Sequence, residues 1–156
     1  MVAGQNSGLP ETPRVKALRR AAAGLIVLLW LAALCFPSLG TCRDGVTTWF
    51  DNSTVLFFGW AGAVSGMMGW YANLFLCRCV YFLASGRVPT LTMGLFTFLL
   101  ACSSFVPAEL AHNEATSEPL CAWGAGFWLW FGCAGAAFLL AIHGALHVAW
   151  AGRTSP

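Results

Sequence analysis

An uncharged stretch in the first half of the sequence most limits what this chain can fold into. It runs from Thr54 to Leu83, and no charged residue stands between Val55 and Leu76. At a rise of about 1.5 Å per residue, a helix over this stretch is long enough to cross a hydrocarbon layer of about 30 Å. The stretch therefore predicts a membrane-spanning helix, which we expect to be the central packing helix of the chain.

Small residues recur along this stretch at alternating spacings of three and four, which places them on one helical face. In lipid, such a face lets another helix backbone approach closely, as in GxxxG pairs. A second run of small and polar residues with the same spacing lies between Pro89 and Val106 and is the expected partner surface. The predicted packing seam comprises Gly59, Gly62, Gly66, Gly69 and Asn73 on the first helix, and Gly94, Thr97 and Ala101 on its partner.

The composition narrows the class of protein. Hydrophobic residues make up 58% of the 156 residues and charged residues only 9%, whereas soluble domains carry about 25% charged residues. This combination excludes a soluble globular domain, and it excludes a disordered chain, which needs low hydrophobicity. The net charge of +2 comes with no basic face of interleaved aromatics, so nucleic acid is excluded as a partner. A membrane domain in contact with the lipid bilayer remains.

Four apolar stretches separated by polar segments predict an all-α integral membrane four-helix bundle with up-down-up-down topology. We expect residues 1–13 to be a mobile cytoplasmic tail and residues 14–156 to form the membrane domain. The four predicted transmembrane helices cover residues 17–39, 54–83, 89–106 and 122–150.

Basic residues predict the orientation of this bundle. In a chain that crosses four times, all but one of the basic residues lie on one side, so both termini are expected in the cytoplasm and the loops 40–53 and 107–121 outside. A positive start before an apolar run is also typical of a signal peptide, although a retained first helix is the preferred interpretation. The basic residues on the cytoplasmic side are Arg14, Lys16, Arg19, Arg20, Arg78, Arg87 and Arg153, and Arg43 lies outside.

The two expected outer loops contain residues with chemistry of their own. Cys42 and Cys121 fall in different loops on the oxidising side, where they can form a structural disulfide. A membrane disulfide oxidoreductase would also need a vicinal C-x-x-C pair, which the sequence lacks. Asn52 opens an Asn-Ser-Thr glycosylation sequon and, as an alternative, Asn52 or Ser53 caps the second helix.

A polar cluster is expected where the second and fourth helices reach the cytoplasmic surface, and it comprises Asn73, Cys77, His143 and His147. The two histidines are four residues apart and share a helical face. With Cys77 they offer the nitrogen and sulfur ligands that zinc or copper prefers, and a haem is a further alternative. Without a nearby carboxylate to orient the imidazoles, the preferred interpretation has no cofactor, and Asn73 and His143 hydrogen-bond to each other between helices.

Two short motifs resemble those of small, uncharacterised four-helix proteins of the bacterial inner membrane. Residues 70–73 (WYAN) and 126–130 (GFWLW) match the W-x-A-N-P and G-[FY]-W-L-W patterns of that group, although Leu74 stands where the group has proline. Pro37 and the Gly59-Trp60 pair match as well. The resemblance covers about residues 20 to 140; it implies a bacterial inner membrane and carries no activity.

Two functions fit these features. The first is a non-enzymatic membrane protein that acts by helix–helix contact with a membrane protein partner or with a second copy, as an accessory subunit or a toxin-neutralising immunity protein would. The alternative handles a small ligand or a metal through the polar cluster. The predicted spans contain no carboxylate, and the chain shows no nucleophile–base pair or phosphate-binding loop, which argues against ion relay and enzymatic chemistry.

Overall fold

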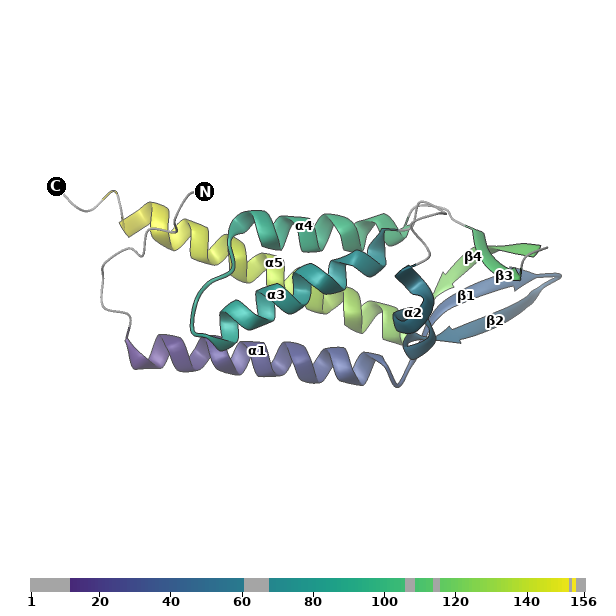
Figure 1. The fold of residues 1–156 in the computed structure, drawn as a ribbon, viewed down its shortest axis with the longest axis horizontal. Coiled ribbons are helices and arrows are strands. Elements are labelled where there is room, and N and C mark those ends of the chain that lie inside the picture. Colours follow the sequence, from purple (N-terminus) through teal and green to yellow (C-terminus); the bar gives the residue numbers. More distant parts are fainter. Residues whose placement is uncertain (1–11, 61–67, 106–108, 114–115, 152, 154–156) are drawn as a thin grey trace.

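The computed structural model describes residues 12–60, 68–105, 109–113, 116–151 and 153. For residues 109–113, 116–119 and 151 it describes the backbone only. The chain is mostly helical, as predicted, and a small sheet lies at one end of the helices (Figure 1). The helices are α1 (Pro13–Ala33), α2 (Asn52–Phe58), α3 (Ala72–Ala84), α4 (Leu91–Cys102) and α5 (Ala125–Ala151). The 3₁₀ turn η2 (Gly69–Tyr71) precedes α3, and η3 (Ser103–Phe105) follows α4. The strands are β1 (Pro37–Arg43), β2 (Val46–Asp51), β3 (Glu109–Asn113) and β4 (Thr116–Trp123).

Helices α1, α3, α4 and α5 pack side by side, and each contacts two neighbours in the cyclic order α1, α3, α4, α5 (Figure 1). Helix α5 also contacts α3 and β1, so α5 is the central packing element. The prediction that the segment 54–83 has this role is therefore wrong. Within the described ranges, α5 is the one helix that is both long and apolar enough to cross a membrane, over Ala125–Trp150, and Leu91–Phe105 is a shorter apolar helix.

The prediction of an all-α chain is wrong, because both predicted outer loops contain antiparallel hairpins. The strand order in the sheet is β2-β1-β4-β3, so the first hairpin pairs with the second through β1 and β4. Asp44 and Gly45 connect β1 to β2 with φ angles of 50° and 78°. An Asp-Gly pair with positive φ at both residues is typical of a two-residue hairpin turn. This local signal predicts the first hairpin, and our sequence interpretation as a loop missed it.

The predicted continuous helix over residues 54–83 is also wrong. Trp70 Nε1 donates a hydrogen bond of 2.7 Å to the carbonyl oxygen of Leu56, and Tyr71 Oη donates one of 3.2 Å to Trp60 O. In one continuous helix Leu56 and Trp70 would lie about 21 Å apart along the axis. The chain therefore turns back between α2 and η2. Gly59 follows the last residue of α2 and Gly69 begins η2, and glycine disfavours a helix interior by about 1 kcal/mol.

The boundaries of the other helices differ from the prediction mainly at the sheet end. Helix α1 ends at Ala33, although the predicted helix continues to residue 39, because the chain from Pro37 onwards pairs in β1. The described helices α4 and α5 lie close to the predicted ranges 89–106 and 122–150. The predicted cytoplasmic tail, residues 1–13, falls almost entirely outside the described residues.

The turn between α3 and α4 is ordered by two helix caps. Gly86 has a φ of +78°, and the bonds from Gly86 N to Leu83 O and from Arg87 N to Phe82 O form a Schellman motif that ends α3. At the start of α4, Thr90 Oγ1 accepts a hydrogen bond of 3.3 Å from Met93 N. The turn is held against α1, because Arg19 Nη1 donates a bond of 2.8 Å to Gly86 O.

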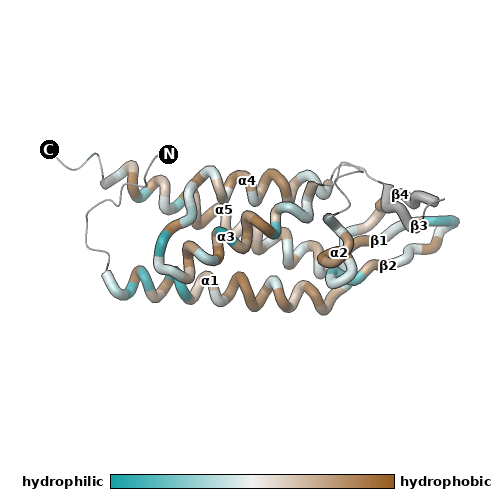
Figure 2. Tube along the Cα trace, in the orientation of Figure 1, coloured by the Kyte–Doolittle hydropathy of each residue, from teal (hydrophilic) through white to brown (hydrophobic). Residues whose placement is uncertain are grey.

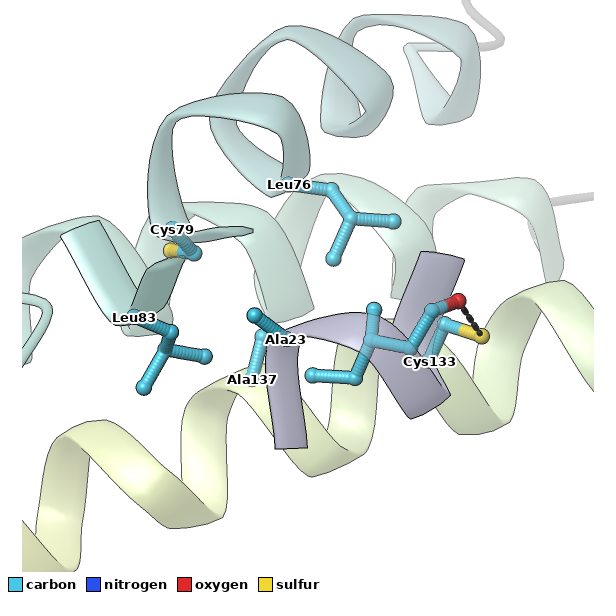
Figure 3. Close-up of a cluster of buried hydrophobic side chains, with 7 residues drawn as sticks. Ala23, Leu76, Cys79, Leu83, Cys133 and Ala137 are labelled. Atoms are coloured by element: carbon cyan, nitrogen blue, oxygen red, sulfur yellow. Dashed lines mark hydrogen bonds between the residues drawn. The ribbon is translucent and has the colours of Figure 1, made fainter. Parts of the chain in front are cut away.

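A cluster of small and aliphatic side chains fills the bundle interior between α1, α3 and α5 (Figure 3). Ala23 and Ala137 meet in this cluster, so the backbones of α1 and α5 can approach closely. Cys133 is buried and its thiol donates a hydrogen bond of 3.6 Å to Ile26 O. Helix α3 contributes Leu76, Cys79 and Leu83 to the same cluster (Figure 3).

Asn52 joins the bundle to the sheet. Its side-chain Nδ2 donates hydrogen bonds of 3.2 Å to Ala33 O, at the end of α1, and 3.3 Å to Gly126 O in α5. Its backbone N–H donates a bond of 3.3 Å to Phe36 O. Because the side chain is buried and both amide hydrogens are engaged, the fold does not leave this sequon nitrogen available for a glycan. The prediction that Asn52 or Ser53 caps the second helix is wrong, because Asp51 occupies the cap position of α2 and the buried Asn52 side chain bonds to α1 and α5 instead.

We expect Gly126→Ala to destabilise the protein by about 1–3 kcal/mol, because the new methyl group overpacks the joint. A Cβ at this position would lie 2.5 Å from Phe36 O and 2.8 Å from Ala33 O, and both atoms are backbone. Gly132→Ala on the same helix is the matched control, since nothing lies within 4 Å of its Cβ position. Thermal unfolding in mild detergent measures both changes. Equal melting temperatures of the two variants would contradict the close contact of α5 with the end of α1.

Candidate functional site

The side-chain amide of Asn73 makes three hydrogen bonds to described residues of the helical part of the chain. Its Oδ1 accepts hydrogen bonds from the indole N–H groups of Trp30, at 3.1 Å, and Trp130, at 2.9 Å. Its Nδ2 donates a bond of 3.0 Å to Trp70 O. The two lone pairs of the amide oxygen are therefore both used. This node ties together α1, α3, α5 and the 3₁₀ turn η2.

The predicted hydrogen bond between Asn73 and His143 is wrong. His143 and His147 are exposed on α5, whereas Ala134, Ala137 and Ala141 are fully buried. Successive helical residues are about 100° apart, so His143, two positions after Ala141, points about 200° away from the buried face. Depth along the helix, on which the prediction relied, does not determine the rotation of α5.

The structure does not bring Asn73, Cys77, His143 and His147 together as a metal cluster. Cys77 is exposed, while Cys79, two residues later, is buried beside Thr97 with 3.7 Å between Sγ and Oγ1. In the part of the chain that the structure describes, no three His, Cys, Asp or Glu side chains group as metal ligands. The polar cluster expected from sequence is replaced by the tryptophan–asparagine node.

The members of the predicted packing seam lie on several surfaces rather than on one helix face. The Cβ position of Gly59 is 2.8 Å from Trp70, whereas Gly69 packs against Ser104 and the backbone of Leu100. Gly62 and Gly66 fall outside the described residues. The first half of the seam is split because the chain turns back between α2 and η2.

The predicted seam residues on α4 are buried, and they contact two different helices. A Cβ at Gly94 would lie 2.6 Å from the Cβ of Ala141 on α5, so these two helices pack in close contact. Thr97 is fully buried; its hydroxyl donates a bond of 2.9 Å to Met93 O and faces Cys79 on α3. Ala101 is fully buried as well. Small residues on α4 thus allow close packing against both α3 and α5.

The structure contains the disulfide between Cys42 and Cys121. Their Cα atoms are 5.8 Å apart, within the usual range for a disulfide. The bond joins β1 to β4 and so links the two hairpins covalently, across 79 residues of sequence. The two ends of the molecule therefore differ in chemistry, with a covalent cross-link only at the sheet end of the described structure.

Aromatic rings gather where the sheet meets the helices. Phe105 packs against Phe131 with 5.2 Å between ring centroids and against Phe127 with 5.3 Å. Trp123 and Trp128 extend the contacts of Phe105, at 5.6 and 5.8 Å. These rings contact one another, so they fill volume at the sheet end of α5.

The residues that sequence reasoning missed are the partners of the two asparagines. Trp30 belongs to no sequence motif. The one signal for a polar partner is that its indole N–H needs an acceptor within an apolar helix. The two motifs that resemble bacterial inner-membrane proteins meet in space, because Asn73 of one bonds to Trp130 of the other. A scan against models of protein families, a search of curated proteins and a search of solved structures each found no match.

Replacing Asn73 with leucine should lower the free energy of unfolding by about 2–4 kcal/mol, because it leaves two indole N–H groups unpaired. The measurement is thermal or denaturant unfolding in mild detergent. In a Trp130→Phe background one of those donors is gone, so the same replacement should cost about 1 kcal/mol less. Trp128→Phe, which alters a more exposed neighbour, is the control background. An identical cost of Asn73→Leu in all backgrounds would contradict the node.

Loss of the disulfide should destabilise the protein while leaving the helices folded. We expect the Cys42→Ser/Cys121→Ser variant to lose about 2–4 kcal/mol of stability. Thiol labelling of the denatured protein, with and without reductant, counts the bonded cysteines. Cys35→Ser, at an exposed free cysteine, is the control. It should leave the stability unchanged and lower the number of labelled thiols by one. Full labelling of Cys42 and Cys121 without reductant would contradict the bond.

Proposed function

We propose that this chain is an integral membrane protein whose helices α1, α3, α4 and α5 lie in the bilayer. The observation that carries the proposal is that these helices consist mainly of apolar residues (Figure 2), of which many large ones are exposed. Large exposed apolar patches on a monomer mark a surface that another apolar phase covers. Leucines that are more than half exposed occur on every one of these helices, namely Leu18, Leu25 and Leu28 on α1, Leu74 on α3, Leu99 on α4, and Leu139 and Leu146 on α5.

The charge distribution supports one orientation. The start of α1, the α3–α4 turn and the end of α5 lie at the end opposite the sheet (Figure 1), and the described charged residues near them are basic. Five of the six acidic residues belong to the hairpin segments, at positions 44, 51, 109, 114 and 118. The positive-inside rule then places the basic end in the cytoplasm and the sheet outside. The disulfide in the sheet fits the oxidising side of the membrane.

The proposed activity is non-enzymatic and consists of binding a membrane protein partner, or a second copy, through the helices. The polar groups of the interior support this activity, because Asn73 and Asn52 are engaged in structural hydrogen bonds. On the sheet side, the described part of the chain outside the bilayer would consist mainly of the two hairpins. By the motif resemblance, we place the protein in a bacterial inner membrane, as an accessory subunit or an immunity protein.

Helix α2 supplies the most exposed aromatic side chains near the sheet. Phe57 and Phe58 are each about 70% exposed (73% and 71%), and the following Trp60 is exposed as well. Aromatic side chains are enriched at protein interfaces. Affinity purification in mild detergent, followed by mass spectrometry and chemical cross-linking, tests the partner. Recovery of a stoichiometric membrane protein, or of a cross-linked dimer, that is lost in Phe57→Ser/Phe58→Ser supports the proposal. A monomer with no partner contradicts it.

Thiol labelling of intact cells should show the sheet outside and the C-terminus inside. In a background with the exposed Cys35 and Cys77 replaced by alanine, Thr48→Cys on β2 should react with an impermeant maleimide. Ser155→Cys should react only after the membrane is permeabilised. The reverse pattern would show that the orientation is wrong. Release of the protein from membranes by alkaline carbonate would show that it does not span the bilayer.

A further inference from the structure

The disulfide between Cys42 and Cys121 presents its two cysteines unequally to the surroundings. Cys121 is exposed, whereas Cys42 is half-buried. The register of β1 against β4 shifts between Gly40 and Thr41, and Cys121 is the residue of β4 that this shift passes over. Such a β-bulge leaves the extra residue outside the regular pairing of the strands. Cys121 therefore offers the more accessible sulfur to an incoming thiol.

Each sulfur atom has a polar neighbour that suits its reduced form. Sγ of Cys42 lies 3.6 Å from Oγ1 of Thr47, the residue opposite it on β2. A hydroxyl that donates to this sulfur stabilises a Cys42 thiolate. Sγ of Cys121 lies 3.4 Å from Gly40 O, which accepts a hydrogen bond from a thiol at that position. Opening the disulfide therefore leaves neither sulfur without a partner.

The two hairpins have backbone contacts that do not depend on the disulfide. Leu39 of β1 is paired with Trp123 of β4, and Gly124 N donates a hydrogen bond of 2.7 Å to Ser38 O. Opening the disulfide is therefore expected to loosen the sheet locally without unfolding the chain. Exposed disulfides have higher reduction potentials than buried structural ones, and they are more often labile or regulatory.

We propose that the Cys42–Cys121 bond is a site of thiol–disulfide exchange with a dithiol protein. A thiolate of that protein attacks Sγ of Cys121 and forms a mixed disulfide, while the Cys42–Cys121 bond breaks and its electron pair leaves on Sγ of Cys42 as a thiolate beside Thr47. The second thiolate of the dithiol protein attacks its own sulfur in the mixed disulfide, and Cys121 leaves as a thiolate. Both thiolates of this chain take up protons. This chain thus gains two electrons and two protons, and the dithiol protein becomes a disulfide.

Reaction of the full-length protein in mild detergent with reduced glutathione, as the probe thiol, tests the proposal. Excess N-ethylmaleimide stops the reaction, and mass spectrometry of the digested protein locates both modifications. We expect the first product to carry glutathione on Cys121 and maleimide on Cys42, with the helical circular dichroism unchanged. Glutathione on Cys42 in the first product would overturn the proposal. Reaction only after denaturant is added would also overturn it, because the bond would then be inaccessible in the folded protein.

Variants of β2 test the assignment of Cys42 as the sulfur that leaves. Thr47→Val removes the hydroxyl but keeps the shape of the side chain, and it should slow the reaction with glutathione about threefold. Thr47→Ser keeps the hydroxyl and should react at the rate of the unchanged protein. Thr48→Val is the matched control, because successive side chains of a strand point to opposite faces of the sheet, and it should not slow the reaction. Equal rates for Thr47→Val and Thr48→Val would overturn the assignment and the proposal with it.

Discussion

Close approach of the helices to α5 is the constraint on which the rest of the structure depends. Ala134, Ala137 and Ala141 have no exposed surface and line the inward face of α5. Gly94 of α4 meets Ala141 so closely that it has no room for a side chain of its own. Small residues let the helix backbones approach closely, and the close approach increases the packing contacts between the helices. This packing brings α1 and α3 close enough to α5 for Asn73 to bond to tryptophans of both α1 and α5.

Three polar ties then hold the bundle at different levels along its length. Asn52 joins the ends of α1 and α5 next to the sheet, Asn73 joins α1, α3 and α5 within the bundle, and Arg19 joins α1 to the α3–α4 turn at the far end. In an apolar medium an unpaired amide is costly, so each pairing restricts which helix rotations are allowed. The tryptophans thus have a specific role at Asn73, because an indole offers both apolar volume and one N–H donor.

The two ends of the molecule are built from different interactions. At the sheet end, backbone pairing, a disulfide and a group of contacting aromatic rings connect two hairpins that are far apart in sequence. At the other end, a helix cap and one arginine bond hold a short turn among basic residues. This asymmetry is the reason for the proposed orientation, in which the sheet lies on the oxidising side of a membrane. Helices with apolar outer surfaces separate the two.

The sequence by itself determined the helical character of the chain, the positions of α4 and α5 and the charge asymmetry between the ends, and it identified Cys42 and Cys121 as residues that can pair, whereas the bond itself is seen only in the structure. These features follow from local composition and from the order of segments along the chain. The Asp44-Gly45 pair is also a local sequence signal, and it predicts the first hairpin. The tertiary structure alone decided the break between α2 and α3, because a glycine-rich apolar segment is compatible with either a helix or a turn. It also decided the partners of Asn73, since helical periodicity allows several rotations of α5 and only packing against three neighbours selects the one that turns Trp130 inward and His143 outward.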